Sequence, residues 1–210
     1  MTRSIILWAI AAYIIGSFPS GYVITKLFHR DKDGKRDGLD IRTIGSGNIG
    51  ATNVRRAMGL GWSWVAGFID ISKGAFALLL AAQLAPQEEQ ETIKAVVALA
   101  VVLGHNFPLW LKFKGGKGVA TTYGTLFFIW PYESFAIVLL CAGLWYIIME
   151  FSRYVSLASM LSLCAMPIGF WVLGSPNAYV IVSVILAALC VFRHRSNIDR
   201  LIHGTENRLK

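Results

Sequence analysis

The sequence predicts an all-α integral membrane protein with seven transmembrane helices, its N-terminus outside and its C-terminus in the cytoplasm. Three observations predict this fold: 55% hydrophobic residues, only 15% charged residues, and a series of long apolar runs. A 210-residue chain with a mean hydropathy of +0.56 is too apolar for a soluble domain. Residues 1–210 are therefore expected to form a single membrane domain.

Seven apolar runs define the expected helices. A membrane-spanning helix needs roughly 20 apolar residues, with about 17 tolerated. Two of the runs are shorter than this and need flanking residues to cross a bilayer. In the first run, Gly16, Pro19 and Gly21 predict a kinked or loosened helix. The runs cover residues 5–27, 62–84, 93–111, 119–130, 135–151, 154–173 and 178–192.

The positive charges predict the orientation. Seven helices with the N-terminus outside place all but three of the 20 lysine and arginine residues in cytoplasmic loops and the tail. The exceptions are Arg3 and Lys94 outside, and Lys73 within a helix. Lysine and arginine accumulate in cytoplasmic loops, so an even number of helices would break the pattern. The net charge of +8 is then explained by topology and anionic headgroups rather than by nucleic acid.

The first polar motif, residues 41–56, reads IRTIGSGNIGATNVRR. Glycines alternate here with small hydrogen-bonding residues, and arginines follow. Glycine permits left-handed backbone and close approach to a ligand, so amide groups can face one concavity, and guanidinium groups add oxyanion affinity. We expect an anion site at the membrane surface. The candidate residues are Gly45, Ser46, Gly47, Asn48, Gly50, Thr52, Asn53 and Arg56.

Two further polar motifs fall on the same predicted face: residues 104–122, GHNFPLWLKFKGGKGVATT, and residues 193–207, RHRSNIDRLIHGTEN. The Gly-Gly-Lys-Gly segment lacks Walker spacing and, alone, is equally typical of a tight turn with snorkelling lysines. A lone histidine at a helix end is more often structural. Their co-occurrence favours one shared site. The candidates are His105, Lys112, Gly115, Gly116, Lys117, Gly118, His194, Asn197 and Glu206.

Other reactive residues receive structural interpretations. Asp70 and Lys73 lie three residues apart within a predicted span, so they share a helix face and are expected to form a structural ion pair. Ser46 lacks a GxSxG context, which argues against a hydrolase triad. Carboxylates and histidines have no metal-ligand spacing, so neither metal nor cofactor is expected.

The three motifs, in this order between hydrophobic helices, resemble those of the acyl-phosphate-dependent glycerol-3-phosphate acyltransferases of bacterial inner membranes. GSFPSGYVITKLF in the first run and RYVSLASML entering the sixth extend the resemblance over nearly the whole chain. It implies a seven-helix inner-membrane enzyme whose active site opens to the cytoplasm, with working loops at approximately residues 29–61, 112–118 and 193–210. The implied reaction moves a fatty acyl group from acyl phosphate to the 1-hydroxyl of glycerol 3-phosphate, giving lysophosphatidic acid.

The resemblance also implies roles for individual residues. Ser46 and Arg56 become essential, and the phosphate of glycerol 3-phosphate lies around residues 115–118 with Lys112 and Lys117 nearby. His194 and Asn197 become functional, Glu206 becomes a structural support, and His105 falls on the histidine of the GH-x-FP motif. One departure is visible: residues 30–39, RDKDGKRDGL, form a longer and more charged connection than the family pattern leads us to expect.

Two questions stay open from the sequence. Position 110 is a tryptophan, so His105 does not begin the His-x4-Asp pair of other acyltransferases, and His105, His194 or a substrate phosphate oxygen is left as the general base. A transporter of a phosphorylated metabolite is the alternative function, although polar groups near one face fit it less well than groups at the midplane would. A single chain suffices for either function, and the oligomeric state is left open.

Overall fold

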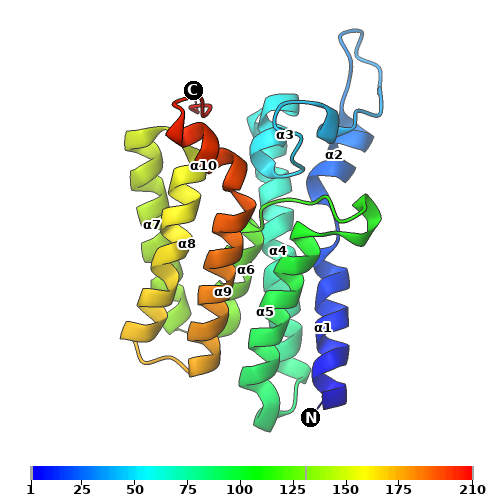
Figure 1. Ribbon diagram of the computed structural model, residues 1–210. Coiled ribbons are helices and arrows are strands. Elements are labelled where there is room, and N and C mark those ends of the chain that lie inside the picture. The colour runs from blue at the N-terminus through cyan, green and yellow to red at the C-terminus, as the bar shows by residue number, and fades with distance from the viewer. Residues whose placement is uncertain (1, 131, 210) are drawn as a thin grey trace.

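The computed structural model describes residues 2–130 and 132–209, and these contain helices but no β-strand (Figure 1). An antiparallel β-bridge joins Arg30 and Arg36. The α-helices are α1 (Thr2–Gly16), α2 (Ser20–Phe28), α3 (Ala51–Met58), α4 (Leu60–Leu84), α5 (Gln90–Asn106), α6 (Val119–Ile129), α7 (Glu133–Ser152), α8 (Val155–Val172), α9 (Asn177–Arg193) and α10 (Arg195–Ile202). Short 3₁₀ turns are η1 (Ile41–Thr43), η2 (Gln87–Glu89) and η3 (Leu109–Leu111).

Each predicted apolar run corresponds to a helix, or in the first run to the pair α1 and α2. Within the described residues, five segments are long and apolar enough to cross a membrane: Arg3–Phe28, Leu60–Leu84, Gln87–Leu111, Glu133–Ser152 and Val155–Val172. The pair α9 and α10, bent by 58°, adds a sixth if it counts as one span. Helix α6 is apolar but shorter. The helical membrane fold is thus confirmed, whereas the count of seven crossings stays a prediction.

The predicted kink in the first run is a complete break at residues 17–19. Helix α1 ends at Gly16 and α2 begins at Ser20, after Pro19. Proline has no backbone N–H and cannot continue a helical hydrogen-bond ladder. The interruption leaves the Phe18 carbonyl oxygen available, and it accepts a hydrogen bond of 3.0 Å from Lys73 Nζ on α4. The break therefore creates a polar point inside an apolar bundle.

Glycines allow the closest helix contacts. A Cβ atom at Gly16 would lie 2.0 Å from the Val101 carbonyl oxygen, so α1 contacts α5 at backbone distance. A Cβ atom at Gly124 would lie 2.1 Å from the Ile71 carbonyl oxygen, which brings α6 equally close to α4. Small residues at helix interfaces are the usual means of close packing in membranes, where lipid offers no hydrophobic drive to association.

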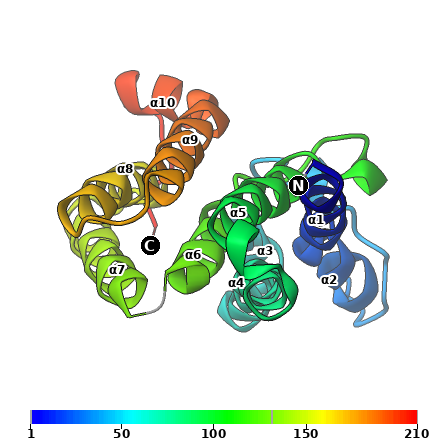
Figure 2. The same ribbon diagram turned by 90° about the horizontal axis from the view of Figure 1, so that it is seen from below.

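The helices form two groups when seen along the bundle: α1, α4, α5 and α6 in one, and α7, α8 and α9 in the other (Figure 2). Contacts of α5 with α9 and of α6 with α7 join them. The core between them is apolar, with Phe170, Leu126 and Leu186 nearly inaccessible. Large apolar side chains also cover the outside, among them Phe68 and Leu140, which fits a surface in contact with lipid.

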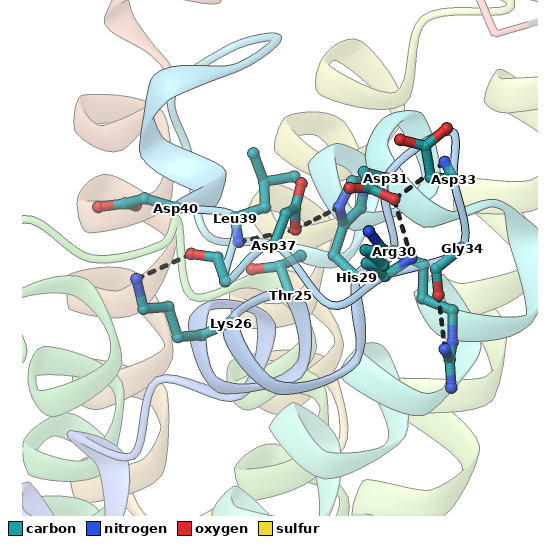
Figure 3. A network of polar contacts seen from close by, with 12 residues as sticks. Thr25, Lys26, His29, Arg30, Asp31, Asp33, Gly34, Asp37, Leu39 and Asp40 are labelled. Carbon is teal, nitrogen blue, oxygen red and sulfur yellow. Dashed lines mark hydrogen bonds and ion pairs between the residues drawn. The ribbon is translucent and has the colours of Figure 1, made fainter.

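The charged connection between α2 and η1 is a hairpin that projects from the end of the bundle carrying α2, α3 and α10 (Figure 1). Its contacts are local, as Figure 3 shows: His29 Nδ1 lies 2.9 Å from Asp37 Oδ1, and Arg30 donates to the Gly34 carbonyl oxygen at 2.7 Å. The Asp31 carboxylate accepts the Lys35 amide at 2.8 Å. The hairpin is thus a self-contained appendage beside the motifs.

Candidate active site

The first motif forms a loop that Asn53 of α3 holds together. The Asn53 amide nitrogen donates to the carbonyl oxygens of Ile41 and Ile44, both at 3.1 Å, and its Oδ1 accepts the Ser46 amide at 3.1 Å. Asn53 is only 1% exposed. Because both of its donors are engaged within the loop, the residue predicted as a substrate contact here supports the loop.

The same contacts bring Gly45, the neighbour of Ser46, close to Arg56. Gly45 has φ +55, a conformation that favours glycine, and a Cβ atom there would lie 2.2 Å from Asn53 Oδ1 and 3.4 Å from Arg56 Cδ. Asn53 and Arg56 are three residues apart and share one face of α3. Both Ser46 and Arg56 are exposed. The loop and α3 therefore expose a hydroxyl and a guanidinium group on neighbouring parts of the chain.

The other predicted residues of this loop lie at the start of α3. The Asn48 side chain accepts the Gly50 amide at 2.9 Å, and Gly50 is the N-cap residue of α3. Thr52 is half-buried in the first turn. Gly47 has φ +66, and its amide donates to the Ile44 carbonyl oxygen at 2.9 Å. Internal bonds thus engage the amides of Ser46, Gly47 and Gly50, which makes the loop stiffer and reduces the amide groups open to a ligand.

The glycines of the second motif pack against the end of α5. The Gly115 amide donates to the Asn106 carbonyl oxygen at 3.2 Å, and the Gly116 amide to the His105 carbonyl oxygen at 3.1 Å. A Cβ atom at Gly116 would lie 2.0 Å from His105 Nε2. These amides face α5, so the glycines provide close packing, and side chains are left to bind an anion.

The two lysines predicted for this motif are in different surroundings. Lys112 is exposed and lines a groove of about 540 Å³ with Phe18, Tyr22, Arg42 and Trp110. Lys117 is half-buried and donates to Asn197 Oδ1 of α10 at 2.5 Å. Gly118, with φ +82, is the N-cap residue of α6 directly after Lys117. The structure thus joins Lys117, and not Lys112, to the C-terminal motif.

Glu206 connects the residues around Lys117. Its carboxylate accepts hydrogen bonds from Asn197 at 2.6 Å, Ser156 at 2.8 Å and Arg200 at 2.7 Å. Burial alone would raise the pKa of Glu206, but these hydrogen bonds outweigh it and lower the pKa, so the group stays charged. The Asn197 amide is thereby oriented with its oxygen toward Lys117.

Burial gives Lys117 an unusual pKa. Loss of water lowers it to about 8, against the attraction of Glu206 and with the repulsion of Arg200 and Arg56. At neutral pH Lys117 is therefore a partly desolvated cation, which a phosphate dianion would stabilise.

The two histidines both engage Nδ1, but with different kinds of partner. His194 Nδ1 lies 2.8 Å from the Cys190 carbonyl oxygen, which can only accept, so Nδ1 carries the proton and Nε2 is unprotonated. Burial, followed by the charge of Lys117, lowers the pKa of His194 to about 4. His105 Nδ1 lies 2.8 Å from Lys73 Nζ and 3.3 Å from Asp70 Oδ1. His105 thus belongs to a buried ionic network.

Asp70 and Lys73 form the predicted ion pair, with Lys73 Nζ 2.8 Å from Asp70 Oδ1. Ser20 of α2 donates to the same Asp70 oxygen at 2.8 Å. Both charged residues are buried, at 2% and 7% exposure. This network lies behind the glycine segment, because His105 is in contact with Gly116.

Comparisons with known proteins agree with this arrangement. A family model described as "Glycerol-3-phosphate acyltransferase" matches residues 6–204, a range that contains the first two motifs and residues 193–204 of the third. The chain belongs to the glycerol-3-phosphate acyltransferase family. A glycerol-3-phosphate acyltransferase of Desulforamulus reducens is 43% identical over 197 residues, which cover 94% of this chain and 91% of that protein. One of Thermus thermophilus is 41% identical over 198 residues, covering 94% and 92%.

Two solved structures have the same fold. Crystal structures of PlsY, an integral membrane glycerol 3-phosphate acyltransferase, match with a TM-score of 0.87 in the glycerol 3-phosphate form and 0.85 in the lysophosphatidic acid form. They are 37% and 36% identical and cover 99% of this chain and 96% of theirs.

The family motifs include residues whose contacts the sequence did not reveal. Arg193, Arg200 and Ser156 hold the site together, although the sequence offered only a basic flank for the arginines and no signal for the serine. No group of three or more histidine, cysteine, aspartate or glutamate residues within the described part of the chain is placed to hold a metal ion.

Proposed function

We propose that this member of the family transfers a fatty acyl group from acyl phosphate to the 1-hydroxyl of glycerol 3-phosphate, forming lysophosphatidic acid and phosphate. The observation that carries the proposal is Lys117: a partly desolvated cation whose ammonium group bonds to Asn197, which Glu206 orients in turn. Such a site suits a phosphate group on a substrate that works beside a membrane. The PlsY structures in glycerol 3-phosphate and lysophosphatidic acid forms support the assignment.

The membrane arrangement proposed is seven crossings with the active site facing the cytoplasm of a bacterial inner membrane. The N- and C-termini lie at opposite ends of the bundle, as an odd number of crossings requires (Figure 1). Helix α6 has 11 residues and spans about 16 Å, less than the roughly 30 Å hydrocarbon core, so it needs its flanking segments. The end with the motifs also carries the hairpin and tail, where the basic residues gather.

The proposed reaction divides the two phosphates between the two motifs. Arg56 holds the donor phosphate, Ser46 orients or donates at the reacting carbonyl, and Lys117 with Asn197 holds the acceptor phosphate. The glycerol hydroxyl oxygen attacks the acyl carbon, a C–O bond forms, and the bond from that carbon to the phosphate oxygen breaks. Negative charge develops on the carbonyl oxygen and the leaving phosphate, and one fixed donor there is worth about 3–4 kcal/mol.

A phosphate oxygen of a substrate takes the hydroxyl proton in this proposal. His105 Nδ1 is engaged with Lys73, and its Nε2 side is packed on Gly116. His194 has a free Nε2, but its pKa of about 4 makes it a weak base. Acyl phosphate has a good leaving group, so weak activation of the hydroxyl suffices.

Two variants separate the candidate bases. Loss of a true general base costs about 10²–10⁴-fold in kcat. We expect His105→Asn and His194→Asn each to keep kcat within about tenfold of the parent protein. A fall of a hundredfold or more in either variant, with loss of its limb in the pH profile, would restore that histidine as the base.

The test of the function is acyl transfer by the purified protein from palmitoyl phosphate to radiolabelled glycerol 3-phosphate, with Ser46→Ala and Arg56→Ala alongside. Product from the parent protein, and none from the folded variants, is the expected result. No product, together with uptake of the labelled phosphate into proteoliposomes, would favour the transporter instead.

A further inference from the structure

Arg193, the last residue of α9, is bound to the backbone of the glycine segment. Its Nη2 donates to the carbonyl oxygens of Gly115 and Gly116, both at 2.9 Å, and its Nε donates to Gly116 at 3.1 Å. Its guanidinium carbon lies 4.9 Å from the centre of the Phe107 ring. Three hydrogen bonds and an aromatic face thus fix one side chain against two consecutive glycines.

The backbone of Gly115 and Gly116 is hydrogen-bonded to α5 on one side and to Arg193 on the other. The amides of Gly115 and Gly116 donate to α5, and their carbonyl groups accept from Arg193 of α9. Lys117 follows directly, and its ammonium group bonds to Asn197, four residues after Arg193. The C-terminal motif therefore holds the segment at the backbone through Arg193 and at the side chain through Asn197.

We propose that Arg193 is a positioning residue that sets the reach of Lys117 toward the phosphate group of glycerol 3-phosphate. The inference rests on the proposed function. A planar guanidinium group presents donors in a rigid fork that can serve two carbonyl oxygens at once, and a single ammonium group does not reproduce this geometry. Removal of the fork frees the segment between α5 and α9, and Lys117 loses its fixed position without any change in its own chemistry.

The experiment compares Arg193→Lys with Arg195→Lys. Both changes keep the charge, but Arg195 is exposed and stacks on Phe192 of α9 at 4.9 Å, away from the glycines. For Arg193→Lys we expect the KM for glycerol 3-phosphate to rise by about tenfold or more, because small misplacements of binding groups are costly. The KM for palmitoyl phosphate and the thermal unfolding temperature are expected to stay near those of Arg195→Lys.

A second readout separates positioning from general loosening. Lys117 is surrounded by Glu206, Arg200, Arg56 and Cys190, and burial keeps its pKa low. In Arg193→Lys the glycine segment moves more freely, so water reaches Lys117 and its pKa rises. The KM for glycerol 3-phosphate should therefore begin to rise at a higher pH than in the parent protein. A purely structural loss of active protein lowers the apparent kcat and leaves this inflection in place.

Two outcomes would overturn the proposal: a KM within about twofold of the parent protein, or an equal change in Arg195→Lys. If Arg193→Lys does not fold, Phe107→Leu removes the aromatic face and leaves the hydrogen bonds, and the same shift of KM is expected at smaller size. Calorimetric titration with glycerol 3-phosphate alone keeps the two proposals distinct. An inactive parent protein would contradict the proposed function. Equal affinity of the parent protein and Arg193→Lys for glycerol 3-phosphate would contradict the positioning role of Arg193.

Discussion

Lys73 and Lys117 are both largely removed from water, and the difference between their surroundings separates a structural site from a functional one. The ammonium group of Lys73 contacts Asp70, His105 and the Phe18 carbonyl oxygen, so its three donors are all engaged by the protein. Lys117 has the hydrogen bond to Asn197, and the carboxylate of Glu206 on the far side of that residue is bound to Asn197, Ser156 and Arg200.

The comparison teaches that residue type alone does not assign a role to a buried lysine. A lysine with complete bonding and an adjacent carboxylate is neutralised and fixed. A lysine with bonding capacity left over, and with its neighbouring carboxylate Glu206 already bound to other side chains, gains from an incoming anion. The predictions below test the two halves of this contrast, beginning with the largest expected effect.

The variant Lys73→Met tests the structural role assigned to Lys73. The change leaves the Asp70 carboxylate, 2% exposed, without its cation. Breaking a buried pair on one side typically costs about 3–5 kcal/mol, so the free energy of unfolding should fall by that amount. Denaturant unfolding in detergent measures it, with Asp70→Asn/Lys73→Met as the control that should recover part of the loss. A fall below about 1 kcal/mol would show that the network is not structural in this sense.

The variant Lys117→Met tests the functional role assigned to Lys117, and we expect it to reduce activity rather than stability. Here kcat/KM for glycerol 3-phosphate should fall by about 10²–10³-fold, the typical effect of losing one key donor, while stability changes little. Lys114→Met is the matched control, because Lys114 belongs to the same segment but is exposed. Comparable losses in both variants would mean that overall positive charge, rather than the Lys117 position, holds the substrate.

The pKa of Lys117 sharpens the comparison through pH. Burial lowers this pKa to about 8, so the ammonium form that binds phosphate is present below pH 8 and is lost as the pH rises above it. The KM for glycerol 3-phosphate should therefore rise above pH 8, by up to about tenfold per pH unit. Initial rates between pH 7 and 9.5 give the profile. Lys117→Arg keeps its charge throughout, so any surviving inflection at pH 8 in that variant belongs to another group.

The smallest effect is expected at the hairpin, which belongs to neither lysine network. Its hydrogen bonds and ion contacts are local, so replacement of residues 30–37 by a glycine-serine linker should change unfolding by no more than about 0.5 kcal/mol. Activity assays and unfolding in parallel check this. A large loss of activity would assign the hairpin a part in the site.

Much of the fold could be predicted from the sequence because apolar length and charge distribution leave few alternatives in a membrane. The break near Pro19 was also predictable, since proline cannot continue a helix. Helices α3 and α10 were not predicted: they are short, polar overall, and stabilised by the loops they hold rather than by an apolar run. Helix α6 has only 11 residues, so its length does not decide whether it crosses the membrane.

The members of the candidate site were proposed from the sequence, whereas the contacts that fix several of them could not be. Ser46, Arg56, Lys117 and Asn197 became candidates because three polar motifs, two of them rich in glycine, fall on one predicted face. The direction of the Gly115 and Gly116 amides depends on packing against α5, which no local pattern encodes. Arg193 looked like a topological flank, because an arginine after a transmembrane run serves that purpose in any membrane protein.

The most direct test of the central claim is calorimetric binding of glycerol 3-phosphate, without donor, at pH 7 to the parent protein, Lys117→Met and Lys114→Met. The account predicts binding by the parent and by Lys114→Met, and loss of measurable binding in folded Lys117→Met. Equal affinities in all three would contradict it and remove Lys117 from the acceptor site.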